Sequence, residues 1–314
     1  MQVPNLTEPC AGKIHEVTIG ATADSGGTRS RAITVGGAQT LPCLDFDGAV
    51  GHRPVIAMDV LDVYPEDWPE ALKEPFGDSL RNPAAWARKC VDEFGADLIC
   101  VKLEGTNPDG ANRSAADAVL VVRRVLEAVS VPLIIWGCDN AEKDGAILPA
   151  VSRAVRGERC LIGAATDKTY KTLAALCLAD GHNLITSAPL DINMARQVNI
   201  LVSDMDFPLD RIVMFQTTGA LGYGLEYAYS IQERQRLAAL AGDKLMAMPV
   251  ICDVGSEAWR AKEAKAADHP EAGPMWELIT ATTLLQSGAD IFRMRHPTAV
   301  AGLKKAIGEV FAEQ

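Results

Sequence analysis

The sequence predicts an α/β protein built as one (β/α)₈ TIM barrel with an N-terminal β-hairpin extension. Short apolar segments alternate eight times with longer amphipathic segments, which is the pattern of parallel strands joined by crossover helices. The 314 residues fit one such barrel, which typically takes about 250 residues and can be longer. A doubly wound sheet is the alternative, but no glycine-rich fingerprint follows the first strand at Asp59–Pro65.

Eight short apolar runs are the expected strands of the barrel. Each has the length of a strand, and several begin after a glycine or proline, residues that interrupt regular structure. Parallel strands covered by helices are mostly apolar, as these runs are. The runs are Pro54–Asp62, Ala96–Glu104, Pro132–Gly137, Cys160–Ala165, Asn183–Ala188, Arg211–Thr217, Pro249–Val254 and Ala289–Arg295.

Helices are expected between these strands, and several carry end signals. Asn82 before Pro83 is a good N-cap followed by a good first-turn residue. Asp167 and Asp191 are expected to cap two later helices, and Gly181 to end the first of these two. One helix begins at Pro83, and the others are expected over Ser114–Val129, Glu142–Val155, Lys168–Ala179, Asp191–Ser203, Leu225–Ala241, Pro274–Ser287 and Pro297–Ala312.

The chain is expected to divide into an extension, residues 1–50, and the barrel, residues 51–314. Alternating segments at His15–Ala21 and Arg31–Val35 flank the turn-forming residues Asp24–Gly27, which predicts a β-hairpin. Strands that precede the first barrel strand often cover the bottom of the barrel, and we expect the hairpin to do so here.

The composition excludes several functional classes. Thirty basic and 41 acidic residues give a net charge of −11, which disfavours binding to nucleic acid or to an anionic membrane. No run of apolar residues approaches the 18 needed for a membrane span. Met1–Cys10 has neither the basic nor the apolar region of a secretory signal, so a cytoplasmic location is expected.

The eight cysteines are scattered along the chain. No two form a C-x-x-C pair, and the closest pair is ten residues apart. Iron–sulfur and structural zinc sites usually cluster their cysteine ligands within a few residues. The chain is therefore not expected to hold a metal ion with its own residues, and the thiols are interpreted as small buried apolar groups.

Charged residues alternate with apolar ones in three strands that are neighbours in a closed barrel. Because side chains alternate along a strand, Asp59, Lys102, Arg293 and their neighbours Glu104 and Arg295 are expected to point into the barrel. Buried charges must be paired, so at least two of Asp59, Lys102 and Arg293 should pair. The cluster is interpreted either as a structural ion network or as the lining of a ligand site.

Lys102 raises the possibility of a lyase. A lysine inside a barrel can form a Schiff base when burial favours its neutral amine. Here the neighbouring carboxylates of Asp59 and Glu104 would favour the charged ammonium, which disfavours Schiff-base chemistry.

Polar residues follow the later strands, at the end where the ligands of such barrels bind. Three glycines in Gly219–Gly224 would let the backbone approach a large ligand closely. The competing interpretation is that these residues only cap helices, above all Asp191 and His296. The candidate binding residues are Asp191, Asn193, Gln216, Thr217, Gly219, Gly222, Asp253, Glu257 and His296.

Several longer stretches resemble one family, the small subunit of the corrinoid iron–sulfur protein of the anaerobic acetyl-CoA pathway. The likeness runs from about Lys13 to the C-terminus. The stretches that carry it are Gly26–Ser30, Arg53–Asp59, Ser187–Asn193, Gly222–Tyr227, Met248–Cys252, Glu257–Ala264 and Met294–Pro297.

The resemblance implies a non-catalytic subunit of a methyl carrier. In that family the small subunit is a (β/α)₈ barrel that pairs with a large subunit, which carries the iron–sulfur cluster and a cobalamin domain. Cobalamin then lies at the mouth of the small subunit's barrel, shared with the large subunit. Methyl passes from methyltetrahydrofolate, by way of a pterin methyltransferase, to cobalt and on to acetyl-CoA synthase; both enzymes are transient partners.

Two further features bear on this resemblance. The chain has no D-x-H-x-x-G stretch, the pattern with which many proteins supply a histidine to cobalt, so it is not expected to ligate cobalt itself. It also departs from the family at Phe215–Ala220, where an Asp-Pro-Ser-Ile-Gly-Gly-like turn is expected. A pterin-dependent methyltransferase on a related barrel is the alternative function, with Asp191 and Asn193 reading the pterin.

Overall fold

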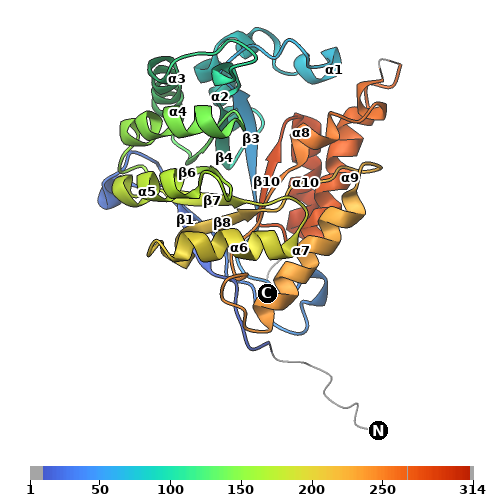
Figure 1. Cartoon of the computed structure of the whole chain (residues 1–314). Coiled ribbons are helices and arrows are strands. Elements are labelled where there is room, and N and C mark those ends of the chain that lie inside the picture. Colours follow the sequence, from blue (N-terminus) through green and yellow to red (C-terminus); the bar gives the residue numbers. More distant parts are fainter. Residues whose placement is uncertain (1–9, 267, 312–314) are drawn as a thin grey trace.

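The computed structural model describes residues 10–266 and 268–311 and has a barrel architecture (Figure 1). Within these residues, eight parallel strands lie side by side in the order β8-β7-β6-β5-β4-β3-β10-β9. Each corresponds to one of the runs expected from the sequence. The strands are β3 (Val55–Leu61), β4 (Leu98–Lys102), β5 (Leu133–Trp136), β6 (Leu161–Ala165), β7 (Asn183–Ser187), β8 (Ile212–Phe215), β9 (Ile251–Asp253) and β10 (Ile291–Met294).

The barrel is closed less tightly between β8 and β9 than elsewhere. A single bridge joins Met214 to Val250 there, with the N–H of Met214 donating to the carbonyl of Pro249 over 2.8 Å. The first and last barrel strands, β3 and β10, pair over four residues. The predicted eightfold barrel is therefore confirmed. Its loosest junction, between β8 and β9, lies two strands away from the junction at which the last strand, β10, pairs with the first, β3.

The helices surround the strands, and most begin where the sequence predicted. Asn82 accepts hydrogen bonds from the first turn of its helix, and Ser114 and Asp117 form a capping box. The principal helices are α2 (Pro83–Asp92), α3 (Ala115–Ala128), α4 (Ala141–Ala154), α5 (Tyr170–Asp180), α6 (Ile192–Ser203), α7 (Leu225–Leu240), α9 (Ala272–Gln286) and α10 (Pro297–Val310). Short helices occur at α1 (Glu70–Lys73) and α8 (Val254–Ala258), and the 3₁₀ turns are η1 (Ala23–Ser25), η2 (Pro42–Leu44), η3 (Gly77–Arg81), η4 (Glu104–Thr106), η5 (Leu209–Arg211) and η6 (Glu263–Lys265).

One expected cap is wrong, and one expected helix end lies outside the described residues. Asp167 does not cap α5, because the preceding turn bonds to itself: the hydroxyl of Thr169 accepts the N–H of Thr166 over 2.9 Å. The helix therefore begins only at Tyr170. Gly181 ends it in the left-handed conformation, as predicted. Ala312, the expected end of the last helix, is not among the described residues, and neither are residues 1–9 of the segment Met1–Cys10. No helix in the described part of the chain is long and apolar enough to cross a membrane.

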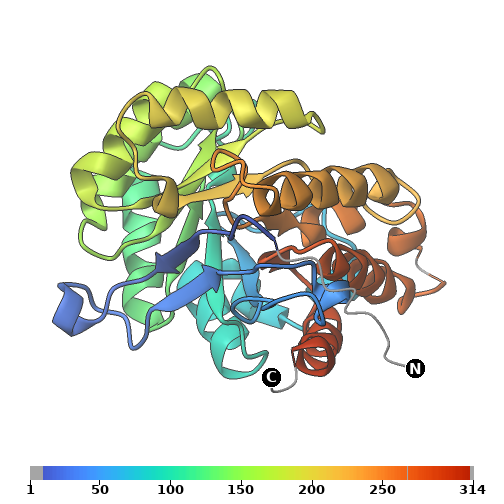
Figure 2. The same cartoon turned by 90° about the horizontal axis from the view of Figure 1, so that it is seen from below.

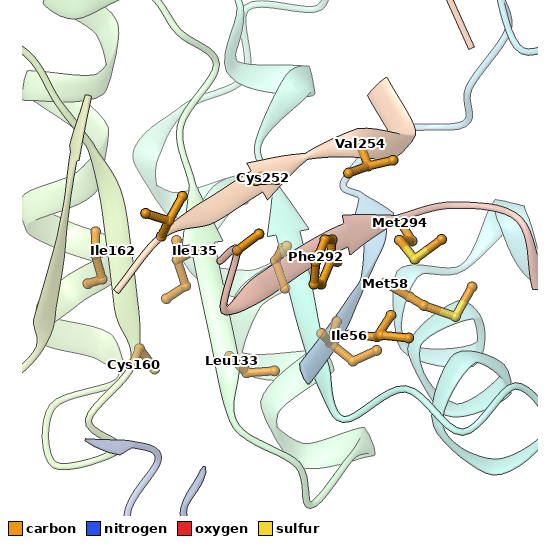
Figure 3. Close-up of a cluster of buried hydrophobic side chains, with 14 of the residues drawn as sticks. Ile56, Met58, Leu133, Ile135, Cys160, Ile162, Cys252, Val254, Phe292 and Met294 are labelled. Carbon is orange, nitrogen blue, oxygen red and sulfur yellow. The ribbon is translucent and has the colours of Figure 1, made fainter. Parts of the chain in front are cut away.

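The core has two layers, which follow from the alternation of side chains along the strands. One layer lies between the strands and the helices, and Figure 3 shows part of it, with Ile56 and Met58 of β3 beside Phe292 and Met294 of β10. The other fills the barrel and includes Ala57, Leu98, Cys100, Ile134, Leu161, Ile185, Val213, Ile251 and Ile291. The inward direction predicted for alternate residues of β3, β4 and β10 is confirmed within the strands, but Glu104, which was also expected to point inward, lies beyond the end of β4.

The hairpin covers the bottom of the barrel (Figure 2). Its strands β1 (Glu16–Ile19) and β2 (Ile33–Gly36) pair antiparallel, with Val17 opposite Val35. One face of the hairpin is apolar and joins the inner layer of the core. The hairpin thus covers one end of the barrel and leaves the opposite end, where the strands terminate, as the place to look for a ligand site.

Arg29 fastens the hairpin to the barrel. Its guanidinium pairs with Glu158 at 3.0 Å and donates to the carbonyl of Leu126 over 2.9 Å, near the end of α3. Both charged side chains are buried. A buried charge that keeps its partner and its hydrogen bonds is tolerated, whereas one that loses its partner is strongly destabilising.

We therefore expect Arg29→Ala to lower the free energy of unfolding by about 3 kcal/mol, because it leaves the Glu158 carboxylate buried and unpaired. Urea denaturation measures this. Arg31→Ala is the matched control, since Arg31 pairs with Asp97 at 3.5 Å but is 54% exposed, and it should cost less than about 1 kcal/mol. Equal losses in the two variants would contradict this role for Arg29.

Candidate functional site

A network of buried charges lies in the upper part of the barrel, at its open end. Arg293 pairs with Asp59 at 3.0 Å and with Asp253 at 3.2 Å. Arg295 reaches the other oxygen of Asp59 at 3.2 Å. The prediction that Asp59 and Arg293 point inward and pair is thus confirmed, with Asp253 as an additional partner.

The electrostatics of Asp59 follow from these contacts. Burial raises the pKa of Asp59, but the charges of Arg293 and Arg295 and their hydrogen bonds outweigh burial and hold that pKa below its ordinary value. Asp59 is therefore ionised, and the two guanidinium groups satisfy both of its oxygens. This pairing crosses from the first barrel strand to the last.

Aromatic side chains fill the barrel axis beside this network. The guanidinium of Arg293 lies 4.3 Å from the ring centroid of Trp136, and that ring meets Phe215 edge to face at 5.0 Å. Trp136 is buried. The upper part of the barrel is therefore occupied by the protein's own rings.

Lys102 points inward as predicted, but its partner differs from the expectation. Its ammonium binds the carboxylate of Asp139, not that of Asp59 or Glu104. Strand β4 ends at Lys102 and the chain turns into η4, so the alternation that placed Glu104 inside no longer applies. Glu104 instead borders a cavity of about 550 Å³ between the loops after β3 and β4, together with Arg295.

The structure places Asp191, Asn193 and Gln216 away from this network. Asp191 caps α6 by accepting the N–H groups of Asn193 and Met194 over 2.8 and 3.2 Å. Asp191 and Asn193 border a groove of about 330 Å³ against α7. Gln216 is buried and donates to Gln235 of α7 over 2.5 Å. The capping interpretation of Asp191 is confirmed, and Gln216 faces a helix.

The loop after β8 is compact and folds on itself. Thr217 has a left-handed φ of +60° and donates to the carbonyl of Ala188 over 3.1 Å. A Cβ on Gly219 would lie 2.3 Å from the carbonyl oxygen of Gly224, so only glycine fits there. Gly222 has a φ of +74° and open space around it. Of these glycines, Gly222 is the one exposed to solvent.

Asp253 belongs to the network and Glu257 lies beside it, whereas His296 lies on the helical side. The N–H of Asp253 donates to Thr218 over 2.8 Å, and Glu257 pairs with Arg260 at 2.7 Å. Burial raises the pKa of Glu257. His296 caps α10 and borders an apolar cavity against α9 and α1, and burial lowers its pKa to about 4.

Two acidic residues near the mouth were not identified from the sequence. Asp139 follows β5 in a turn, where the alternation of side chains along a strand no longer predicts direction. The polar segment Gly137–Asn140, which comes directly after a strand, was the signal that could have identified it. Glu277 lies inside α9, where nothing distinguishes it from a surface residue. It is fully buried and accepts the indole N–H of Trp259 over 2.7 Å and the backbone N–H of Arg295. Glu277 therefore ties the loops after β9 and β10 together.

The cysteines do not gather in the described residues. Six of the eight are buried and separate, and Cys10 and Cys43 are exposed, contrary to the expectation that the thiols are buried. Burial raises the pKa of Cys160 and Cys252 to about 12, so these thiols are neutral. In the described part of the chain, no group of three or more His, Cys, Asp or Glu side chains is arranged to hold a metal ion.

The ion network makes a clear prediction for stability. Asp59→Asn removes the carboxylate shared by the buried Arg293, which keeps only Asp253, and the half-buried Arg295. It should lower the free energy of unfolding by about 3 to 5 kcal/mol. Asp243→Asn is the control, because Asp243 pairs with Arg196 at 2.9 Å near the surface and should cost less than about 1 kcal/mol. Chemical denaturation of both variants measures the two losses of unfolding free energy, and losses of similar size would refute a structural role for the network.

Glu277 predicts a pH dependence. Burial raises its pKa from 4.5 to about 7, so the stability that the protonated form contributes is present below pH 4.5 and is lost as pH rises through about 7. Between pH 5 and 8 the free energy of unfolding of the wild type should fall by roughly 2 to 3 kcal/mol relative to that of Glu277→Gln. Urea denaturation across this range measures it, and parallel stability curves for the two proteins would contradict it.

Solved structures resemble this chain in fold. A dihydropteroate synthase from Coxiella burnetii superposes with a TM-score of 0.59 at 13% identity, covering 94% of this chain and 98% of that one. The dihydropteroate synthase from Thermus thermophilus gives a TM-score of 0.57 at 16% identity, covering 91% and 98%. At such identities the likeness concerns the barrel alone.

Sequence comparison is more specific. The chain is 40% identical over 311 residues to the acetyl-CoA decarbonylase/synthase complex subunit delta of Archaeoglobus fulgidus, covering 95% of this chain and 68% of that protein. It is 36% identical to the subunit delta of Methanothermobacter thermautotrophicus, covering 96% and 77%. The family described as CO dehydrogenase/acetyl-CoA synthase delta subunit matches residues 16–300, from the hairpin to α10. The chain therefore belongs to the CO dehydrogenase/acetyl-CoA synthase delta subunit family.

Proposed function

We propose that this chain is the small, non-catalytic subunit of a corrinoid iron–sulfur methyl carrier. It helps to hold cobalamin at its barrel mouth, so that methyl from methyltetrahydrofolate passes through cobalt to acetyl-CoA synthase. The observation that carries the proposal is the family match over residues 16–300, which includes every strand of the barrel and its hairpin. Relatives in the same family are named as subunits of an acetyl-CoA decarbonylase/synthase complex.

The shape of the barrel fits such a role. The hairpin covers the bottom and rings fill the axis, so a large ligand can rest on the mouth but not enter the barrel. A corrin is a broad disc edged with amide groups, and it needs hydrogen-bonding groups on several loops. The mouth offers the carboxylate of Asp253, the Thr217 region and the exposed Gly222, on loops after two neighbouring strands.

The nine candidate residues divide within this proposal. Thr217, Gly222, Asp253 and Glu257 lie in the loops after β8 and β9 and are the ones we assign to cofactor contacts. Gly219 keeps the loop after β8 compact. Asp191 and Asn193 shape the rim at α6, and Gln216 and His296 serve packing and capping, because their polar atoms face helices.

In this proposal the chain's own residues hold and shield the cofactor. Three carboxylates, of Asp59, Asp139 and Asp253, balance the cations of Lys102, Arg293 and Arg295 beneath the mouth. A balanced network places little net charge against a ligand above it. Cobalamin, when bound, supplies the cobalt that takes up and releases the methyl group; no residue of this chain is assigned a catalytic step.

The proposal includes partners. A large subunit would carry the iron–sulfur cluster and a cobalamin domain that covers the other face of the corrin. The pterin methyltransferase and acetyl-CoA synthase would bind transiently. Support for placing the cluster on the large subunit comes from the sequence, in which the cysteines are scattered and the closest pair is ten residues apart.

Two alternatives receive less support. A pterin methyltransferase would use Asp191 and Asn193, but the carboxylate of Asp191 is engaged by the N–H groups of its own helix. The rings of Trp136 and Phe215 occupy the barrel axis. A lyase based on Lys102 is disfavoured because the Lys102 ammonium is paired with Asp139.

Co-expression with the large subunit tests the proposal. The purified complex should show corrinoid absorbance with about one cobalamin per heterodimer, whereas the lone chain should bind neither iron nor cobalt tightly. The reason is that each chain would cover only one face of the corrin. Tight binding of methyltetrahydrofolate by the lone chain, or a complex without corrinoid, would overturn the proposal in favour of the pterin enzyme or another function.

A further inference from the structure

Asp139 combines features that its ion pair does not explain. Its φ is +65°, in the left-handed region that residues other than glycine adopt at a cost. Its side chain is 65% exposed, whereas that of its partner Lys102 is only 10% exposed. Strained, exposed residues at the ends of barrel strands are associated with function rather than with packing.

The turn around Asp139 is built to hold it. The buried carboxylate of Asp144 accepts the N–H of Cys138 over 2.8 Å and that of Asp139 over 3.1 Å. Gly137 makes this possible, because a Cβ there would lie 2.3 Å from the Asp144 carboxylate. A buried acidic residue and a required glycine thus fix the backbone of Asp139.

The side chain of Asp139 is fixed as well. The indole N–H of Trp136 donates to one carboxylate oxygen over 2.9 Å, and the ammonium of Lys102 binds the other. Because an indole N–H lies in the plane of its ring, the carboxylate lies at the edge of the Trp136 ring, and that ring also meets Phe215 edge to face.

The carboxylate retains capacity for a ligand. A carboxylate has about four acceptor positions, and two donors leave the rest free. Partial loss of hydration raises the pKa of Asp139, but Lys102 and the Trp136 hydrogen bond outweigh it and lower that pKa, so the group is ionised. An ionised acceptor held rigidly is suited to an N–H donor such as an amide.

We propose that Asp139 is a ligand-positioning residue, whose carboxylate accepts a hydrogen bond from an amide group at the edge of the corrin. This inference rests on the proposed function and extends the site across the mouth, from the loops after β8 and β9 to the turn after β5. Lys102 and Trp136 orient the acceptor, and Asp144 orients its backbone.

The test uses the full chain co-expressed with the large subunit and reconstituted with hydroxocobalamin. Asp139→Asn keeps the size of the side chain and its tolerance of a left-handed φ, but removes the charge. Cobalamin content and the rate of cobalamin release are measured by absorbance, and heterodimer formation by size-exclusion chromatography. We expect retention about tenfold weaker or more, because a charge-assisted hydrogen bond is lost, with the heterodimer intact.

Asp206→Asn is the matched control. Asp206 is also an exposed aspartate with a left-handed φ, of +57°, but it follows α6, at the other end of the barrel. It should keep the cobalamin content of the wild type. The double variant Lys102→Met with Asp139→Asn removes the buried ammonium that the single variant leaves without its carboxylate. It should recover any lost thermal stability and still release cobalamin quickly.

The outcomes are separable. A wild-type complex without cobalamin overturns the proposed function, and this inference with it. A loaded wild type with an equally loaded Asp139→Asn variant overturns the inference alone. An Asp139→Asn variant that no longer binds the large subunit also overturns the inference, since Asp139 would then contact a cationic group of that partner. A double variant that regains cobalamin together with stability overturns the inference as well.

Discussion

The pairing of Asp59 with Arg293 and Arg295 is the interaction on which the upper barrel depends. It links β3, the first barrel strand, to β10, the last, and adds to a backbone pairing of four residues. Charges buried this deeply are tolerated only with their partners in place. The same guanidinium of Arg293 covers Trp136, so the ion network also determines how the rings fill the barrel axis.

This arrangement places rigid, closely packed side chains directly beneath the barrel mouth. The rings and the paired charges occupy the upper barrel, and Glu277 ties together the two loops that follow β9 and β10. Rigid elements hold ligand-contacting groups more accurately than mobile loops do. The cofactor-holding role proposed for this chain would depend on such rigidity more than on titratable groups.

The two ends of the barrel are built from different chemistry. At the bottom the hairpin contributes an apolar face, fastened by the buried pair of Arg29 and Glu158. At the mouth, polar residues take unusual backbone conformations, as at Asp139 and Thr217. Buried ion pairs thus stabilise both ends of the barrel. Asp139 and Thr217 take their left-handed φ where strands end, which is where barrel proteins place their ligands.

Local patterns in the sequence determined the eight strands, the hairpin and the inward direction of Asp59, Lys102 and Arg293, because strand alternation and helix caps depend on neighbouring residues. Tertiary structure decided which charges meet. Lys102 pairs with Asp139 rather than Glu104 because β4 ends at Lys102 and the chain turns. Gln216 and His296 face helices, and Glu277 is buried, for a similar reason: contacts between distant segments set their surroundings. No pattern within one segment encodes such contacts.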